Sequence, residues 1–190
     1  MQRSFITDKI YKGKNYTTHR LERREYENCT FNGCNFENSL LDNQNFMECT
    51  FIDCNLSSVN ITNTTFKEVS FINCKILGVN FETCNTFLID FVFHNCTLNY
   101  ASFFGLTLKN QQFKDSKLIE VDFTKSELNG VDFSGCNLEQ AIFDRTNLEK
   151  ADFTTAFNHT IDPEKNELKK AKFSKDGLSG LLIKHQLIIE

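Results

Sequence analysis

The chain has 190 residues, of which 40% are hydrophobic and 24% charged, and its net charge is −4 at neutral pH. This length suits a single domain, and the acidic balance argues against direct binding to nucleic acid, which needs a basic surface. We expect no membrane association, because no segment has the length of a transmembrane helix and the first residues lack the apolar core of a signal peptide.

Residues 1–25 are the least regular part of the sequence and are net basic. Tyr11, Tyr16 and Leu21 recur at intervals of five, but basic side chains lie at positions where the later sequence has small residues. Because the ends of a repetitive fold need polar covers, we predict that this segment is an N-terminal cap. Its arginine cluster at 20–24 is interpreted as a solvated face.

From residue 26 to residue 81, every fifth residue is large and apolar. The twelve positions are Tyr26, Phe31, Phe36, Leu41, Phe46, Phe51, Leu56, Ile61, Phe66, Phe71, Ile76 and Phe81. The residue two places before each of them is usually small or apolar, and the other three are mostly polar. Positions two apart share a face of an extended chain, and an odd period requires a corner in every pentad. The pattern therefore predicts a solenoid of very short strands, with one side of the coil per pentad.

The phase of this repeat shifts by two residues between Phe81 and Leu88. We expect a bulge or small loop at 82–88 to absorb the extra residues. In one interpretation this is an accommodated insertion without a role. In the other it is a contact site that turns an aromatic side chain outward, and its residues are Thr83, Asn85 and Phe87.

From Leu88 to Phe153, Leu and Phe alternate at every fifth residue without exception. An even number of sides per coil would stack Phe on Phe and Leu on Leu in separate columns, whereas three sides would mix them. Cys34, Cys54 and Cys74, spaced by twenty, also indicate four pentads per turn. We therefore predict a four-sided coil with an apolar interior.

Acidic side chains accompany the cleanest part of the repeat. Residues 28–157 contain 16 acidic and 8 basic residues, so the middle of the rod is acidic while both ends are basic. We predict a negatively charged binding surface whose candidate residues are Asp122, Glu127, Asp132, Glu139, Asp144, Glu149 and Asp152.

The repeat loosens after Phe153 and returns at Leu168 and Phe173. Ser174 can then cap a short helix with an apolar stripe, and residues 187–189 are typical of a strand. This C-terminal segment, 174–190, either folds back on the last coil or joins two copies of the chain. The residues predicted for a homodimer contact are Leu178, Leu181, Leu182, Leu187 and Ile189.

The eight cysteines occupy inward positions that Ala and Val occupy in other pentads. A free Cys behaves as a small buried hydrophobe, and a five-residue spacing puts neighbouring cysteines on different sides of the coil, which is unsuitable for zinc. We expect reduced thiols, no metal and no cofactor. Eight reduced thiols favour a cytoplasmic location.

The sequence offers no catalytic constellation. No two of the four histidines are twenty residues apart, so the register would not stack them. A Gly-rich phosphate loop, a nucleophile elbow and a His-Glu metal motif are all missing. A filled interior leaves no pocket that could desolvate a carboxylate, and we predict that the protein is not an enzyme.

Several pentads resemble the A-(D/N)-L-x-x consensus of pentapeptide-repeat proteins, among them residues 131–135, residues 136–140 and the pentad that starts at Ala151. The resemblance implies an all-β fold, a right-handed quadrilateral β-helix, over residues 26–173. The stretch from Ile161 to the C-terminus is similar to that of quinolone-resistance (Qnr-type) members, which dimerise there, and this favours a homodimer.

The same resemblance implies a function. Qnr-type proteins are DNA mimics, and an acidic rod of about duplex width could occupy the DNA-binding saddle of a type II topoisomerase, gyrase or topoisomerase IV. Gram-negative Qnr-type members carry projecting loops that matter for gyrase protection, whereas this chain offers only the slip near 83–87. The alternative is a rigid protein–protein interaction scaffold with an unrelated target.

Overall fold

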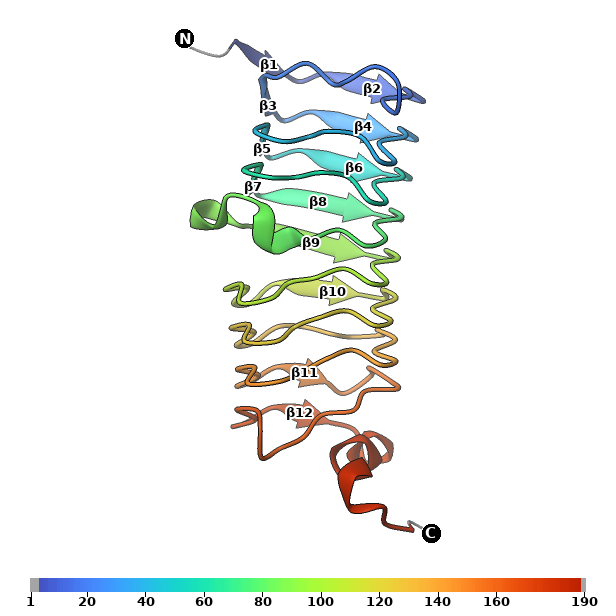
Figure 1. The fold of residues 1–190 in the computed structure, drawn as a ribbon, viewed down its shortest axis with the longest axis vertical. Coiled ribbons are helices and arrows are strands. Elements are labelled where there is room, and N and C mark those ends of the chain that lie inside the picture. Colours follow the sequence, from blue (N-terminus) through green and yellow to red (C-terminus); the bar gives the residue numbers. More distant parts are fainter. Residues whose placement is uncertain (1–3, 189–190) are drawn as a thin grey trace.

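The computed structural model describes residues 4–188, which form a right-handed quadrilateral β-helix of about eight turns and a short helical segment after it (Figure 1). This confirms the predicted fold class. The strands are β1 Phe5–Thr7, β2 Ile10–Lys12, β3 Glu25–Glu27, β4 Thr30–Asn32, β5 Asn45–Met47, β6 Thr50–Ile52, β7 Thr65–Lys67, β8 Val69–Ile72, β9 Phe91–His94, β10 Gln112–Lys114, β11 Asp152–Phe153 and β12 Lys172–Phe173. The 3-10 helices are η1 Phe81–Thr83, η2 Thr86–Leu88, η3 Asp176–Leu181 and η4 Ile183–His185.

Each coil has four sides, which the chain passes in the same order in every turn. Side 1 carries β1, β3, β5 and β7, and side 2 carries β2, β4, β6, β8, β9 and β10 in parallel pairing, with β11 and β12 further along. Sides 3 and 4 follow and are joined between coils by isolated bridges such as that of Asn35 with Asn55. Tyr26 lies in register with Phe46, so a coil has twenty residues, which is the four-pentad turn that the sequence predicts.

The corner of most pentads lies two residues after the apolar centre, where φ is positive. Examples are Asp53 with φ 52° and Glu120 with φ 55°. The N–H at such a corner donates to the next coil, as Asn38 does to the carbonyl of Ser57 at 3.0 Å. None of the described non-glycine residues with positive φ is β-branched, because β-branched side chains are strained most in the left-handed region. Corner residue type is therefore selected by backbone geometry.

The pentad centres stack in columns that fill the interior. On side 2, the ring centroids of Phe93 and Phe113 are 5.3 Å apart, and those of Phe113 and Phe133 are 5.5 Å apart. On the opposite side 4, Phe103 and Phe123 stack at 5.3 Å. The two columns meet edge to face, as Phe113 does with Phe123 at 5.7 Å, which is a favoured aromatic geometry. In the coils after the insertion, Leu columns occupy sides 1 and 3, as the alternation from Leu88 to Phe153 predicts.

One coil contains two extra residues. Phe71 pairs with Phe93, a register of 22 in place of 20, and the chain projects from the rod around η1 and η2, drawn in green in Figure 1. Before this coil the Phe columns occupy the neighbouring sides 1 and 2, whereas after it they occupy the opposite sides 2 and 4. Phe91 bridges the two arrangements of Phe columns. Its ring centroid lies 6.4 Å from that of Phe66, the last Phe of side 1, and 5.4 Å from that of Phe81, the first Phe of side 4.

Residues 5–21, which lie within the segment predicted as an N-terminal cap at 1–25, form a first coil of the β-helix. β1 pairs with β3 and β2 with β4. Tyr11 stacks on Phe31 at 4.8 Å and Tyr16 on Phe36 at 4.7 Å. The apolar residues at every fifth position decide the structure of this segment, because basic side chains at the end of a rod can extend into water.

The loop between this coil and the next is held by side chains. Gln44, fully buried, accepts the N–H of Arg24 at 3.1 Å and donates to two carbonyls of the same loop. Arg20 and Arg23 both donate to the carboxylate of Asp42. The arginines that the sequence suggests are solvated therefore clamp the first coil onto the following one.

The C-terminal segment differs from its prediction in two ways. The helix after Ser174 is present as two 3-10 helices, and the hydroxyl of Ser174 accepts the N–H of Gly177 at 3.0 Å. Gly177 and Gly180 disfavour a regular α-helix. The predicted strand is not formed at residues 187–188, because a strand needs a neighbouring edge and the chain has left the last coil. Ile189, the remaining residue of that strand, lies outside the described residues.

Candidate interaction surfaces

The filled core leaves the outer surface as the part of the molecule that can contact other molecules. The Phe and Leu side chains at the pentad centres from Phe93 to Phe153 are buried, and Phe123 and Phe133 have no exposed surface. Within residues 4–188, no group of three or more His, Cys, Asp or Glu side chains is arranged to hold a metal ion. No helix in that range has the length and apolar character needed to cross a bilayer.

The seven acidic residues predicted as a binding surface lie on all four sides of the rod. Residues five apart in sequence pass to successive sides, and only residues about twenty apart become neighbours in space. Asp132 and Asp152 are such register partners on side 2. The others are distributed as Asp122 and Asp144 on side 4, Glu127 and Glu149 on side 1, and Glu139 on side 3.

Basic side chains accompany four of these seven carboxylates. The pairs are Lys114 with Asp132 at 3.5 Å, Lys172 with Asp152 at 3.1 Å, Arg145 with Asp144 at 3.1 Å and Lys150 with Glu149 at 3.6 Å. Hydrogen bonds from Thr154, together with the ammonium of Lys172, hold the pKa of Asp152 below its usual value. Across the described residues, Asp122, Glu127 and Glu139 have no basic partner, so they contribute most to the negative potential.

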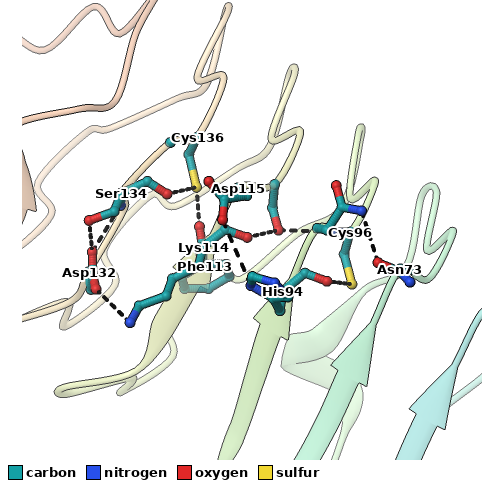
Figure 2. A network of polar contacts seen from close by, with 12 residues as sticks. Asn73, His94, Cys96, Phe113, Lys114, Asp115, Asp132, Ser134 and Cys136 are labelled. Carbon is teal, nitrogen blue, oxygen red and sulfur yellow. Dashed lines mark hydrogen bonds and ion pairs between the residues drawn. The ribbon is translucent and has the colours of Figure 1, made fainter.

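A network of polar contacts joins neighbouring coils at the border of sides 2 and 3 (Figure 2). Asn95 donates to the side chain of Asn73, one coil away, at 2.9 Å. The thiol of Cys96 donates to the carbonyl of His94 at 3.5 Å. All eight cysteines are buried and unbridged, as their inward positions predict, and burial raises the pKa of Cys136 to about 12. The thiol of Cys136 therefore remains a protonated donor and satisfies the backbone carbonyl of Phe113.

The two-residue insertion displays an aromatic side chain. Phe87 is 85% exposed, and its N–H donates at 3.2 Å to Asn85, whose amide donates at 3.2 Å to the hydroxyl of Thr65. The hydroxyl of Thr83 donates to the carbonyl of Asn80 at 2.8 Å and holds the preceding turn. The three predicted contact residues thus lie in one hydrogen-bonded loop with Phe87 on its surface.

The predicted homodimer residues are only partly on the surface. Leu178, Leu182 and Leu187 are exposed, whereas Leu181 packs against the core. Ile183, which is not among the residues predicted from the sequence, is also exposed and lines a groove of about 350 Å³ with Leu182 and Leu187. Its position in a run of three apolar residues is the signal that could have found it.

His159, also not selected from the sequence, is buried between the last coil and the C-terminal helices. Its ring packs 5.7 Å from Phe153 and 5.4 Å from Phe173, and its Nε2 lies 3.0 Å from the carbonyl oxygen of Gly177. A carbonyl only accepts, so Nε2 carries the proton, while the buried Nδ1 has no partner in the described structure. Burial lowers the pKa of His159. A Cβ at Gly180 would lie 2.2 Å from the carbonyl oxygen of His159. His159 therefore anchors the C-terminal helices by close packing.

Comparison with known protein families identifies the repeat. A model of the pentapeptide repeat region matches residues 24–103 and 44–123, and a model of eight pentapeptide repeats matches residues 116–154. The chain belongs to the pentapeptide-repeat family. Among curated proteins, no sequence matches this pentapeptide-repeat protein.

Solved structures of other pentapeptide-repeat proteins have a similar fold. Two trypsin-treated forms of QnrB1, a plasmid-mediated fluoroquinolone resistance protein, each match with a TM-score of 0.63 and 18% identity. The matches cover 98% of this chain and 100% of that chain in one case, and 100% and 95% in the other. HetL, which is involved in heterocyst differentiation regulation in the cyanobacterium Nostoc, matches with a TM-score of 0.56 and 13% identity over 92% of this chain and 88% of that one. At these identities the likeness establishes a shared fold.

Proposed function

We propose that this pentapeptide-repeat protein is a non-enzymatic DNA mimic that binds a type II topoisomerase and thereby affects quinolone sensitivity. The observation that carries the proposal is that an acidic four-sided rod shares its fold with QnrB1 along nearly the whole of both chains. QnrB1 is a plasmid-mediated fluoroquinolone resistance protein, and the resemblance to Qnr-type members implies gyrase or topoisomerase IV as the target. A negative potential along the rod would steer it toward a basic DNA-binding surface.

Two kinds of contact support such binding. Asp122, Glu127 and Glu139 offer carboxylates without a basic partner in the described structure, and the other four predicted acidic residues add partly neutralised ones. Phe87 offers an apolar anchor, because an exposed aromatic side chain on an ordered loop can fill a pocket of a partner at little cost in conformational entropy.

A homodimer in the cytoplasm is consistent with the proposed binding to a type II topoisomerase. The groove formed by Leu182, Ile183 and Leu187 would be covered by a second copy, since exposed apolar patches of this kind mark association sites. Two rods joined at their C-terminal ends would double the length of the surface offered to the topoisomerase. We expect Leu182→Asp combined with Leu187→Asp to give a monomer in sedimentation equilibrium, whereas Leu40→Asp, at an exposed apolar residue on side 4, leaves the oligomeric state unchanged.

DNA supercoiling by gyrase tests the proposed function. Protein at about micromolar concentration should inhibit supercoiling at low salt, with weaker inhibition above about 0.3 M salt, because exposed charges are then screened. Reversing Asp122, Glu127 and Glu139 to Lys should weaken inhibition more than the matched reversal of Glu25, Glu27 and Glu37 in the early coils. Absence of any effect on gyrase and topoisomerase IV at low salt, with or without a quinolone, would refute the proposal.

A rigid scaffold for an unrelated protein is the second candidate function. The observation that favours it is the distribution of the carboxylates over four sides, four of them beside basic groups, which gives no continuous acidic stripe. A pull-down from cell extract eluted with salt separates the two functions, because topoisomerase subunits should be recovered only under the first.

A further inference from the structure

The N-terminal end of the rod is a sheet edge that no described strand covers. β1 and β2 are the end strands of their sheets and lie at the N-terminal end in Figure 1. In the next coil, the N–H of Thr30 points toward this end and donates to the carbonyl of Lys9 at 2.8 Å. Ile10 is the register partner of Thr30, so its N–H points the same way, out of the rod. By the same register, the carbonyl of Lys12 points outward too.

The end of the core is open beside this edge. Tyr11 and Tyr16 stack on the following coil with one ring face and are half-buried. Together with Ile6, Lys9, Tyr26 and the loop residues Arg20, Leu21 and Glu22, they line a groove of about 250 Å³. A strand laid along β2 would therefore find backbone hydrogen-bonding groups and, on its inward face, an apolar floor.

The charge around the edge is positive. Residues 4–24 contain six basic and two acidic side chains. Arg20 and Arg23 are engaged with Asp42, but Lys9, Lys12 and Lys14 are exposed, and none of the described ion pairs involves them. Lysines on an edge strand repel an identical edge, so they disfavour pairing between the N-terminal ends of two copies of this chain.

We infer that this end docks an extended acidic peptide segment of another protein, which adds to β2 as a parallel strand. Main-chain hydrogen bonds to Ile10 and Lys12 would give affinity, and alternate side chains would give selectivity. Apolar side chains of the peptide face the groove at Tyr11 and Tyr16, and carboxylates face the lysines. The acidic middle of the rod repels such a peptide, which restricts binding to this end. The inference is independent of the proposed topoisomerase target.

Fluorescence anisotropy with a labelled peptide of about eight residues, alternating Glu and Val, tests the inference. Ile10→Pro removes one outward N–H and no native hydrogen bond, and edge strands tolerate Pro. This substitution should weaken peptide binding at least about tenfold, whereas Ile10→Val should not weaken it. Lys9→Glu combined with Lys14→Glu keeps the backbone intact and should weaken binding by a similar factor. A peptide with Lys in place of Glu should not bind.

Backbone chemical shifts locate the bound peptide, and they should change only within about residues 5–35. Equal affinity of the acidic peptide for the Ile10→Pro and Ile10→Val proteins, with both shown to be folded by circular dichroism, would mean that charge alone causes binding. That result would overturn strand addition. Failure of the acidic peptide to bind at low salt would mean that the lysines serve only to repel other edges. Self-association that Ile10→Pro abolishes would assign the edge to a second copy and also overturn the inference.

Discussion

At the scale of single residues, the pentad centre and the corner require opposite kinds of side chain. The centre requires a large apolar side chain because each ring contacts rings in the coil before, in the coil after and across the core. Phe123 stacks on Phe103 and Phe143 at 5.3 and 5.2 Å and meets Phe113 and Phe133 edge to face. Burial in such contacts makes the centre sensitive to volume.

Replacing a pentad centre should therefore cost far more than replacing the exposed Phe. We expect Phe123→Ala to lower the free energy of unfolding by about 3–5 kcal/mol, the range for a large cavity in a packed core. Phe87→Ala, at the exposed loop, should change it by less than about 0.5 kcal/mol. Urea denaturation followed by circular dichroism measures both, and equal losses would contradict the assignment of the two side chains to core and surface.

A corner residue should respond to substitution with the opposite preference. Glu120 has φ 55° and is exposed, so Glu120→Gly relieves strain in the left-handed region and should raise the free energy of unfolding by about 0.5–1 kcal/mol. Glu120→Val should lower it by at least about 1 kcal/mol, because a β-branched side chain is disfavoured there. Thermal unfolding of the two variants should shift in opposite directions. Shifts of the same sign would mean that the corner is not strained.

At the scale of elements, the two ends of the rod are closed by different means. The first coil is held by a charge clamp, in which burial alone would raise the pKa of Asp42 but the hydrogen bond of Asn43 and the charges of Arg20 and Arg23 leave it below its usual value. The C-terminal helices are held by packing around His159, with glycine at the closest approach. The first end is thus sensitive to charge and the second to volume.

The clamp predicts how the first coil depends on pH. A lowered pKa means that Asp42 contributes stability above about pH 4, the usual carboxyl value, and that this contribution is lost as pH falls through the folded-state value. Asp42→Asn should lower the free energy of unfolding by about 1 kcal/mol at neutral pH, because the arginines are partly exposed, and by almost nothing near pH 2.

Amide hydrogen exchange gives the location of this effect. Exchange in residues 5–25 should accelerate in the Asp42→Asn protein at neutral pH, while that of later coils stays unchanged. Glu48→Gln, at an exposed carboxylate outside the described ion pairs, is the matched control. A difference between Asp42→Asn and the wild type that persists undiminished at low pH would rule out the carboxylate as its cause.

At the scale of the whole molecule, stability depends on matching one coil to the next. Deleting residues 114–133 removes one complete turn, and Phe113 then stacks on Phe153, so the shorter protein should keep a β-helix. Deleting residues 131–135 removes one side and puts Leu138 beneath Phe113, which loses two Phe–Phe stacks at the junction, each about 0.5–1.5 kcal/mol.

Thermal unfolding compares the two deletions directly. We expect the twenty-residue deletion to unfold at the higher temperature, although it removes more of the chain. A more stable five-residue deletion would show that the columns do not have to match between coils.

Much of the fold could be predicted because a solenoid repeats one local rule. The twenty-residue turn, the separate Phe and Leu columns and the inward cysteines all follow from spacing. Harder to predict were contacts that depend on which coils become neighbours, such as that of Arg20 and Arg23 with Asp42, and the closing of the core by His159. The spatial arrangement of the candidate acidic surface was also harder to predict than the core, since residues close in sequence are carried to four different sides.

The sequence by itself determined the four-sided rod, because a large apolar residue at every fifth position can be buried only inside such a coil. It also determined where the repeat breaks, since a shift of two residues cannot be absorbed without a projection. Only the tertiary structure decided which charges are neutralised, which aromatic side chain is displayed, and how the two ends of the rod are closed. Those properties arise between residues about one turn apart, or at an end where the repeat no longer applies, and no local pattern encodes them.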